Sequence, residues 1–229
     1  MAKHAKTLAE WFGVEKLDFQ LMQESSVIAE TAFVTVDVQE GFAQCADDSK
    51  RKKQLDQDVN GSPLTEKIAE KIANATPNFR QAGFPIIHVF TTNEENLKNN
   101  TPYDYCGHFY KLSLQDGDIL HPKKDWSAFT NKEATNTIWP SFQTTLDNNR
   151  IRNVIITGLY TSMCIKETVC DALSKKFNVC VLEDMTTDEI DFKKEHHLET
   201  MQTAGAFICH STDFSPCLLY TSPSPRDRG

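Results

Sequence analysis

Short apolar runs rich in β-branched residues recur along this chain of 229 residues, and they constrain its fold more than any other feature. Their near-continuous apolarity, without polar alternation, is typical of strands covered on both faces, which indicates a parallel sheet. Four runs are pronounced, a fifth is expected at 206–210, and a shorter, weaker one lies at 118–121. The four pronounced runs are 32–38, 85–91, 153–157 and 178–182.

Helical patterns alternate with these runs. The clearest spans 63–81, where Ile68 and Ile72 belong to one apolar stripe and Gly83 offers a stop. The others are expected at 139–148, 164–176 and 189–204. Such alternation predicts right-handed crossovers and a three-layer α/β/α sandwich with a mainly parallel, six-stranded, Rossmann-like sheet. Ligands of such folds bind at the carboxyl ends of the strands.

Charge and cysteine usage exclude several classes of protein. A net charge of −8 argues against nucleic-acid and anionic-membrane binders, which need clustered Lys and Arg. No apolar run approaches the ~20 residues of a membrane span, and the first residues lack the apolar core of a secretory signal. None of the seven cysteines forms a CxxC pair, so the sequence suggests neither a zinc site nor a redox pair. We therefore expect a cytoplasmic protein with free thiols.

Two segments stand apart from this pattern. The segment 92–122 is long, polar and irregular and contains Tyr103, Tyr105, His108, Phe109 and Tyr110, and we expect a loop that faces the substrate or another subunit. Residues 217–229 resemble the translation of a sequencing adapter, or else form a disordered tail, and are not expected to belong to the folded domain. Deletion after Pro216 is expected to leave fold and activity intact.

Cys164 lies where the apolar run 153–157 gives way to a small-residue turn and a helix. A helix N-terminus supplies partial positive charge and free N–H groups, which favour a thiolate and can hold an oxyanion. A lone cysteine at such a junction is, however, more often a small buried residue. Taken alone, Cys164 leaves both interpretations open.

Two further positions carry charge at the same predicted edge of the sheet. Asp37 ends the first strand, where a carboxylate is costly unless paired or used. Lys123 and Lys124 follow the weak run at 118–121, and either could supply a cation. Each of these residues also has a structural interpretation, but together with Cys164 they form a candidate constellation.

Three ordered motifs resemble the isochorismatase-like cysteine hydrolase superfamily over roughly residues 30–215. Each motif is weak alone, and their order and spacing make the signal specific. They are D-x-Q-x-x-F (Asp37, Gln39, Phe42), K-x-x-x-S-A-F (Lys123, Ser127, Ala128, Phe129) and G-x-x-T-x-x-C-x-x-x-T (Gly158, Thr161, Cys164, Thr168).

The resemblance implies a role for each matching residue. Asp37 would be the general base, Cys164 the nucleophile, and Lys123, four residues before Ser127, the cation that supports the thiolate. A cis peptide at Leu159–Tyr160 would aim the N–H groups of Tyr160 and Cys164 at an oxyanion. Residues expected to line the substrate pocket are Phe42, Trp126, Phe129 and Tyr160.

The resemblance also implies an organisation: an N-terminal helical extension at 1–30, a hydrolase domain at 31–216, and a homo-oligomer acting on a small molecule without cofactor. Nicotinamide-hydrolysing members carry an Asp-x-His metal site after the second strand, whereas residues 91–96 here contain no histidine. Members that cleave isochorismate lack the cysteine. A metal-independent cysteine amidohydrolase acting on a small amide, ureido or carbamoyl compound is therefore the leading hypothesis.

Three alternatives remain open. The first is a catalytically idle, oligomeric binding or scaffold protein of the same fold. The second, less favoured, is a nicotinamidase. The third is a redox role for Cys164 with Cys170, which is ranked last because six helical residues span ~9 Å, beyond the reach of a disulfide.

Overall fold

The computed structural model describes residues 7–14, 22, 26–44, 61–92, 108–130, 139–188 and 194–214. The adapter-like segment 217–229 and residues 93–107 of the irregular segment lie outside these ranges. In the described part of the chain, no helix is long and apolar enough to cross a membrane.

All six apolar runs form strands of one sheet, in the order β3-β2-β1-β4-β5-β6. Every neighbouring pair is parallel, as the continuous apolar composition predicts. The strands are β1 (Thr31–Val36), β2 (Ile86–Thr91), β3 (Ile119–Lys123), β4 (Asn153–Leu159), β5 (Asn178–Thr187) and β6 (Phe207–Cys209). The predicted fold class, a three-layer sandwich around a six-stranded sheet, is confirmed.

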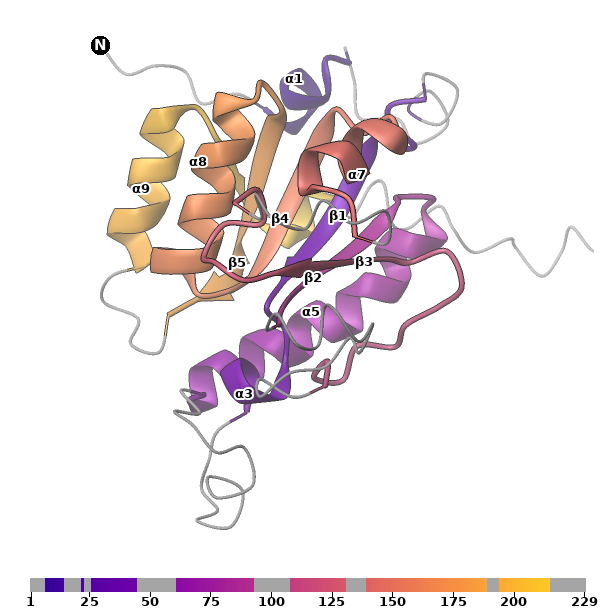
Figure 1. Cartoon of the computed structure of the whole chain (residues 1–229). Helices are drawn as coiled ribbons and strands as arrows, with labels where there is room; N and C mark the ends of the chain where they lie inside the picture. The colour runs from indigo at the N-terminus through magenta and orange to yellow at the C-terminus, as the bar shows by residue number, and fades with distance from the viewer. Residues whose placement is uncertain are drawn as a thin grey trace, which may run out of the picture.

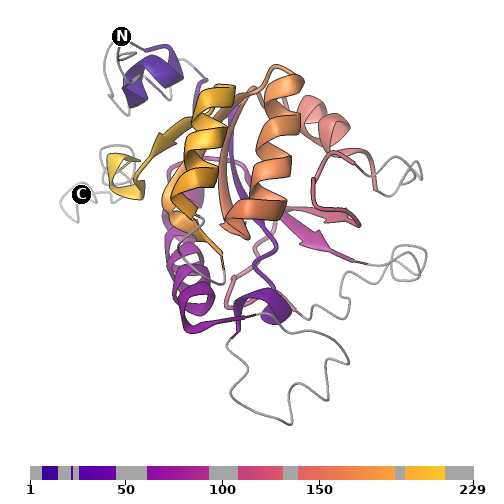
Figure 2. The ribbon, with the colours of Figure 1, turned by 90° about the vertical axis from the view of Figure 1, so that its left-hand side faces the viewer.

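Helices cover both faces of this sheet (Figure 1). The helix α5 packs on one face, and α7, α8 and α9 pack on the other, which Figure 2 shows from the side of α8 and α9. The helices are α1 (Leu8–Phe12), α3 (Glu40–Ala43), α5 (Pro63–Gln81), α7 (Phe142–Asn148), α8 (Lys166–Ser174) and α9 (Lys194–Ala204).

Local sequence signals explain the limits of α5. Ser62 caps its N-terminus by accepting a hydrogen bond from the Thr65 N–H, and Pro63 occupies the first turn, where its missing N–H costs nothing. Gly83, with φ of +92°, then turns the chain toward β2. The helix spans the predicted 63–81, whereas α7 begins three residues later than predicted and α9 is described only from Lys194.

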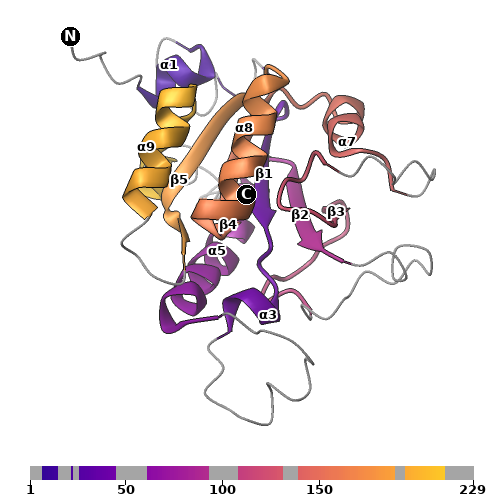
Figure 3. The same cartoon turned by 60° about the vertical axis from the view of Figure 1, so that its left-hand side comes forward.

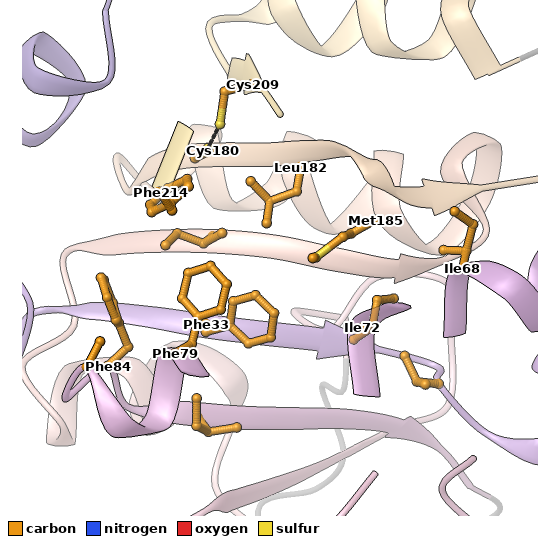
Figure 4. Packing of buried hydrophobic residues seen from close by; sticks show 14 of the residues in the cluster. Phe33, Ile68, Ile72, Phe79, Phe84, Cys180, Leu182, Met185, Cys209 and Phe214 are labelled. Carbon is orange, nitrogen blue, oxygen red and sulfur yellow. Dashed lines mark hydrogen bonds between the residues drawn. The ribbon is translucent and has the colours of Figure 1, made fainter. Parts of the chain in front are cut away.

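The core has two parts, one on each face of the sheet. Figure 4 shows the part beneath α5, where Phe33 stacks on Phe79 with ring centroids 4.1 Å apart. The N-terminal helix α1 joins this part, since Trp11 stacks on Phe207 and Phe12 packs against Phe214. The separation of residues 1–30 as an extension remains a prediction, although α1 contributes to the core.

The last residues of the irregular segment pack against the body of the fold. The ring of Phe109 packs edge-on against Phe90, and the Tyr110 hydroxyl donates to the Glu66 carboxylate over 2.7 Å. Phe109 also pairs with Gln39 in an isolated antiparallel bridge. The segment therefore ends beside the residues that follow β1.

Candidate active site

The carboxyl ends of β1, β3 and β4 bring the three sequence motifs together. Figure 3 shows these strands, with α8 following β4. Asp37 follows β1 directly, Lys123 ends β3, and Cys164 lies in a π-helical turn, η1 (Thr161–Ile165), between β4 and α8. The site lies at the edge where a doubly wound sheet places its ligands.

Gly158 explains why β1 and β4 approach so closely at this edge. It has φ of +127°, and a Cβ at this position would lie 2.0 Å from the Val36 carbonyl oxygen. Only glycine fits there. The absence of a side chain at Gly158 thus lets the turn that leads to Cys164 lie next to the end of β1, where Asp37 lies.

The three candidate catalytic side chains form one buried contact set. The Lys123 ammonium lies 2.8 Å from Asp37 Oδ2 and donates to the Cys164 sulfur over 3.4 Å. Asp37 and Lys123 are each 1% exposed, and Cys164 is 7% exposed. It is Lys123, rather than Lys124, that contacts both partners.

Thr91, at the end of β2, completes this set and was not singled out from the sequence. Its hydroxyl donates to Asp37 Oδ1 over 2.9 Å and accepts from the Lys123 ammonium over 3.1 Å. Gln39 fixes Thr91 in turn, because its side-chain oxygen accepts from the Thr91 N–H over 2.8 Å. The sequence signal that could have identified Thr91 is a polar residue at the carboxyl end of a buried strand.

The protonation pattern favours a neutral thiol beside an ion pair. Burial raises the pKa of Cys164 to about 12, and the Asp37 charge adds to this effect more than Lys123 offsets it. Burial opposes the charged form of Lys123, but Asp37 and Cys164 keep its pKa above the usual value. This differs from the expectation that the helix N-terminus favours a thiolate: desolvation and Asp37 outweigh the helix.

Hydrogen bonds hold the turn that carries Cys164. The Tyr160 carbonyl accepts from the N–H groups of Met163 and Ile165, each over 3.1 Å, and the N–H of Ser162 donates to Asp188. The turn held in this way includes Cys164, whose N–H the resemblance names as an oxyanion donor. The peptide bond Leu159–Tyr160 is cis, as the resemblance implied.

The four predicted pocket residues lie in different surroundings. Phe42 and Tyr160 pack edge to face with centroids 6.0 Å apart, and the Tyr160 hydroxyl donates to the Phe42 carbonyl. Trp126 is 60% exposed. Phe129 packs against Phe142 of α7, with centroids 4.9 Å apart, so its position in the core gives no support to a place in the pocket.

The loop after β3 is attached to α8. The Ser127 hydroxyl donates to Asp171 over 2.6 Å, and the Ala128 N–H donates to the Thr168 hydroxyl over 3.1 Å. These bonds account for the S-A-F block and for the last threonine of the cysteine motif, because they join the end of the Lys123 strand to the helix that follows Cys164.

Among the residues that the structure describes, no three His, Cys, Asp or Glu side chains are grouped to hold a metal ion. Asn93 to Asn96, where the sequence lacks the Asp-x-His motif, lie outside the described ranges. His88 lies in the core, its ring nitrogen 2.8 Å from the Thr35 hydroxyl.

Comparison with known proteins agrees with this geometry. The family model for the isochorismatase domain matches residues 31–213, most of the chain. The chain belongs to the isochorismatase family. The resemblance inferred from the three motifs is confirmed, and all three lie within the matched residues.

Proteins similar to this chain include enzymes that are named as amidohydrolases. A ureidoacrylate amidohydrolase of Pseudomonas savastanoi pv. phaseolicola is 31% identical over 105 residues, which cover 45% of this chain and 40% of that protein. The chain thus matches less than half of the length of this relative.

Solved structures share the fold at low sequence identity. A cysteine hydrolase from Pseudomonas syringae pv. phaseolicola aligns with a TM-score of 0.66 and 16% identity, over 85% of this chain and 94% of that one. An N-carbamoylsarcosine amidase from Thermoplasma acidophilum aligns with a TM-score of 0.58 and 20% identity, over 80% of this chain and 96% of that chain.

Proposed function

We propose that this member of the isochorismatase family is a cysteine amidohydrolase that cleaves a C–N bond of a small amide, ureido or carbamoyl compound. The observation that carries the proposal is the buried set in which the Lys123 ammonium contacts both the Cys164 sulfur and the Asp37 carboxylate. The family match and the partial similarity to a ureidoacrylate amidohydrolase support the reaction class.

The first half-reaction uses Asp37 as the proton acceptor. The Asp37 carboxylate and the Cys164 thiol both contact the Lys123 ammonium, so the thiol proton moves to Asp37 as the sulfur attacks the carbonyl carbon. The Lys123 ammonium remains charged and stabilises the sulfur and then the carboxylate. A nucleophile that is generated during the attack needs no preformed thiolate.

Departure of the amine completes the first half-reaction, and hydrolysis of the thioester is the second. The tetrahedral oxyanion is held by the backbone N–H groups of Cys164 and Tyr160, donors of a kind worth roughly 3–4 kcal/mol in other enzymes. The amine leaves with the proton from Asp37, which forms the thioester. Asp37 then takes a proton from water, the hydroxide attacks the thioester, and Asp37 returns that proton to the departing Cys164 sulfur, which restores the thiol and the carboxylate as the acid is released.

A screen of small amides and ureides for released ammonia tests this function. The full chain should release ammonia from at least one compound and pass through a covalent adduct at Cys164 that mass spectrometry detects. Cys164→Ala should abolish both signals, since no other group in this contact set can form the thioester.

Cys170→Ala provides the matched control. Cys170 lies in α8, half-buried and outside the contact set of Asp37, Lys123 and Cys164, so its removal should leave turnover unchanged. Full activity of the Cys164→Ala variant would overturn the proposal.

A further inference from the structure

Asp188 follows β5 directly and lies against the turn that carries Cys164. Its Oδ1 accepts hydrogen bonds from the N–H of Ser162 over 2.9 Å and from the Ser162 hydroxyl over 2.7 Å. Ser162 precedes Cys164 by two residues in η1. The two bonds fix the carboxylate at the carboxyl edge of the sheet, beside the turn of the nucleophile.

The other oxygen of this carboxylate has no bond to the protein. Asp188 is only 6% exposed, and within the described residues Oδ2 is buried without a hydrogen-bond partner. A buried polar atom left unpaired costs free energy, roughly 1–3 kcal/mol for an ordinary group and more for a charged one. Such an atom calls for a specific explanation, and a ligand that supplies the missing donor is one.

Asp184, on the same strand, shows that the unpaired oxygen is particular to Asp188. Asp184 Oδ1 accepts from the Ser211 N–H over 2.7 Å, and its Oδ2 is paired with Lys71. Both oxygens of Asp184 are therefore used within the protein. Asp188 lies four residues further along, at the edge where the substrate is expected.

We propose that Asp188 is a specificity-determining residue whose Oδ2 accepts a hydrogen bond from an N–H of the substrate. In a ureido or carbamoyl compound, the carbonyl carries a second N–H that a simple carboxamide replaces with a methylene group. A buried oxygen without a donor favours the first class, because the carboxamide would leave it unpaired. The inference rests on the proposed function and narrows its substrate class to compounds with this additional donor.

Two probes of the same shape test this preference. n-Propylurea and pentanamide have equal length and the same terminal carboxamide, and they differ only by an N–H in place of a methylene group. Binding is measured by calorimetric titration of the full chain carrying Cys164→Ala, so that no turnover is needed. n-Propylurea should bind at least about tenfold more tightly, which corresponds to ~1.4 kcal/mol.

Adding Asp188→Asn to this chain should abolish or reverse the preference. Asparagine keeps the size and one oxygen for Ser162, but it presents an amide NH2 where Oδ2 was. Asp184→Asn in the same background is the matched control, since both of its oxygens are already bonded, and it should keep the preference. Thermal unfolding of the variants verifies that each is folded.

Equal affinity for the two probes in the Cys164→Ala chain would overturn the inference. An unchanged preference after Asp188→Asn, or its loss after Asp184→Asn, would overturn it as well. Ammonia release by the wild-type chain tests the proposed function separately, so the failure of one is distinguishable from the failure of the other.

Discussion

Cys164 and the pair formed by Cys180 and Cys209 are buried thiols of the same sheet in opposite surroundings. Cys164 lies on the face of α8, in contact with the Lys123 ammonium, which also contacts Asp37. Cys180 and Cys209 lie on the face of α5, with their sulfur atoms 3.2 Å apart among apolar side chains (Figure 4).

Low exposure does not distinguish these thiols. Burial raises the pKa of Cys180 well above its usual value, and the neighbouring Cys209 adds to this effect, so both environments keep the sulfur protonated. The difference lies in the neighbours: Cys164 has a carboxylate that can take its proton and an ammonium that can compensate the charge. Reactivity at this edge therefore depends on a proton acceptor rather than on a low pKa.

The largest expected effect follows from removing that acceptor. Asp37→Asn keeps the size of the side chain but removes the base, so kcat of the proposed amidase should fall roughly 10²- to 10⁴-fold. Steady-state ammonia release measures the change. Cys180→Ala is the comparison variant and should retain kcat. A fall of less than about tenfold in Asp37→Asn would contradict the role of Asp37 as base.

The buried ion pair is expected to dominate stability on this face. Lys123→Met leaves the Asp37 carboxylate buried and unpaired, which should lower the free energy of unfolding by about 3–5 kcal/mol. Urea denaturation measures the loss. Combining Lys123→Met with Asp37→Asn should recover part of it, because no charge then remains buried. A double variant as unstable as Lys123→Met would show that packing, rather than charge, explains the loss.

The fold could be predicted from the sequence because its signals are local. The apolar runs and helical stripes give the elements, and their alternation gives the layers. The site was predicted mainly through three spaced motifs. The choice between Lys123 and Lys124 required strand pairing: β3 places Lys123 opposite Thr91, and consecutive strand residues face opposite sides of a sheet.

Contacts between distant segments could not be predicted in this way. Thr91 meets Asp37 across 54 residues, and Cys180 meets Cys209 only because β5 and β6 adopt one particular register. Phe129 belongs to a matching motif, yet it packs in the core beneath α7. A motif gives the position of a residue in the chain, whereas its neighbours depend on how the elements pack.

A smaller stability effect separates the two thiol environments. Cys180→Ala removes a sulfur atom from a close-packed apolar cluster, so the free energy of unfolding should fall by about 1–2 kcal/mol while turnover is kept. Cys164→Ala should cost less stability, because it also removes a thiol held next to a buried ion pair. Chemical denaturation of both variants measures the difference. A larger loss for Cys164→Ala would show that its sulfur is chiefly a packing atom.

The smallest expected effect concerns the alkylation rate of Cys164. In Asp37→Asn this rate should rise, whereas turnover should fall. With a pKa of about 12, Cys164 should react with iodoacetamide at a rate that rises about tenfold per pH unit from pH 7 to 10, because only the thiolate reacts. Asp37 raises this pKa, so Asp37→Asn should increase the thiolate fraction at a given pH, and hence the labelling rate, by up to about tenfold. The same change should slow hydrolysis, which needs the base.

Peptide mass spectrometry follows labelling at Cys164, with Cys180 as the internal reference that Asp37→Asn should leave unchanged. Slower labelling of Cys164 in Asp37→Asn would mean that the Asp37 carboxylate assists the sulfur even toward a reagent that needs no oxyanion. It would contradict a role of Asp37 in which proton acceptance and negative charge have opposite effects on the sulfur.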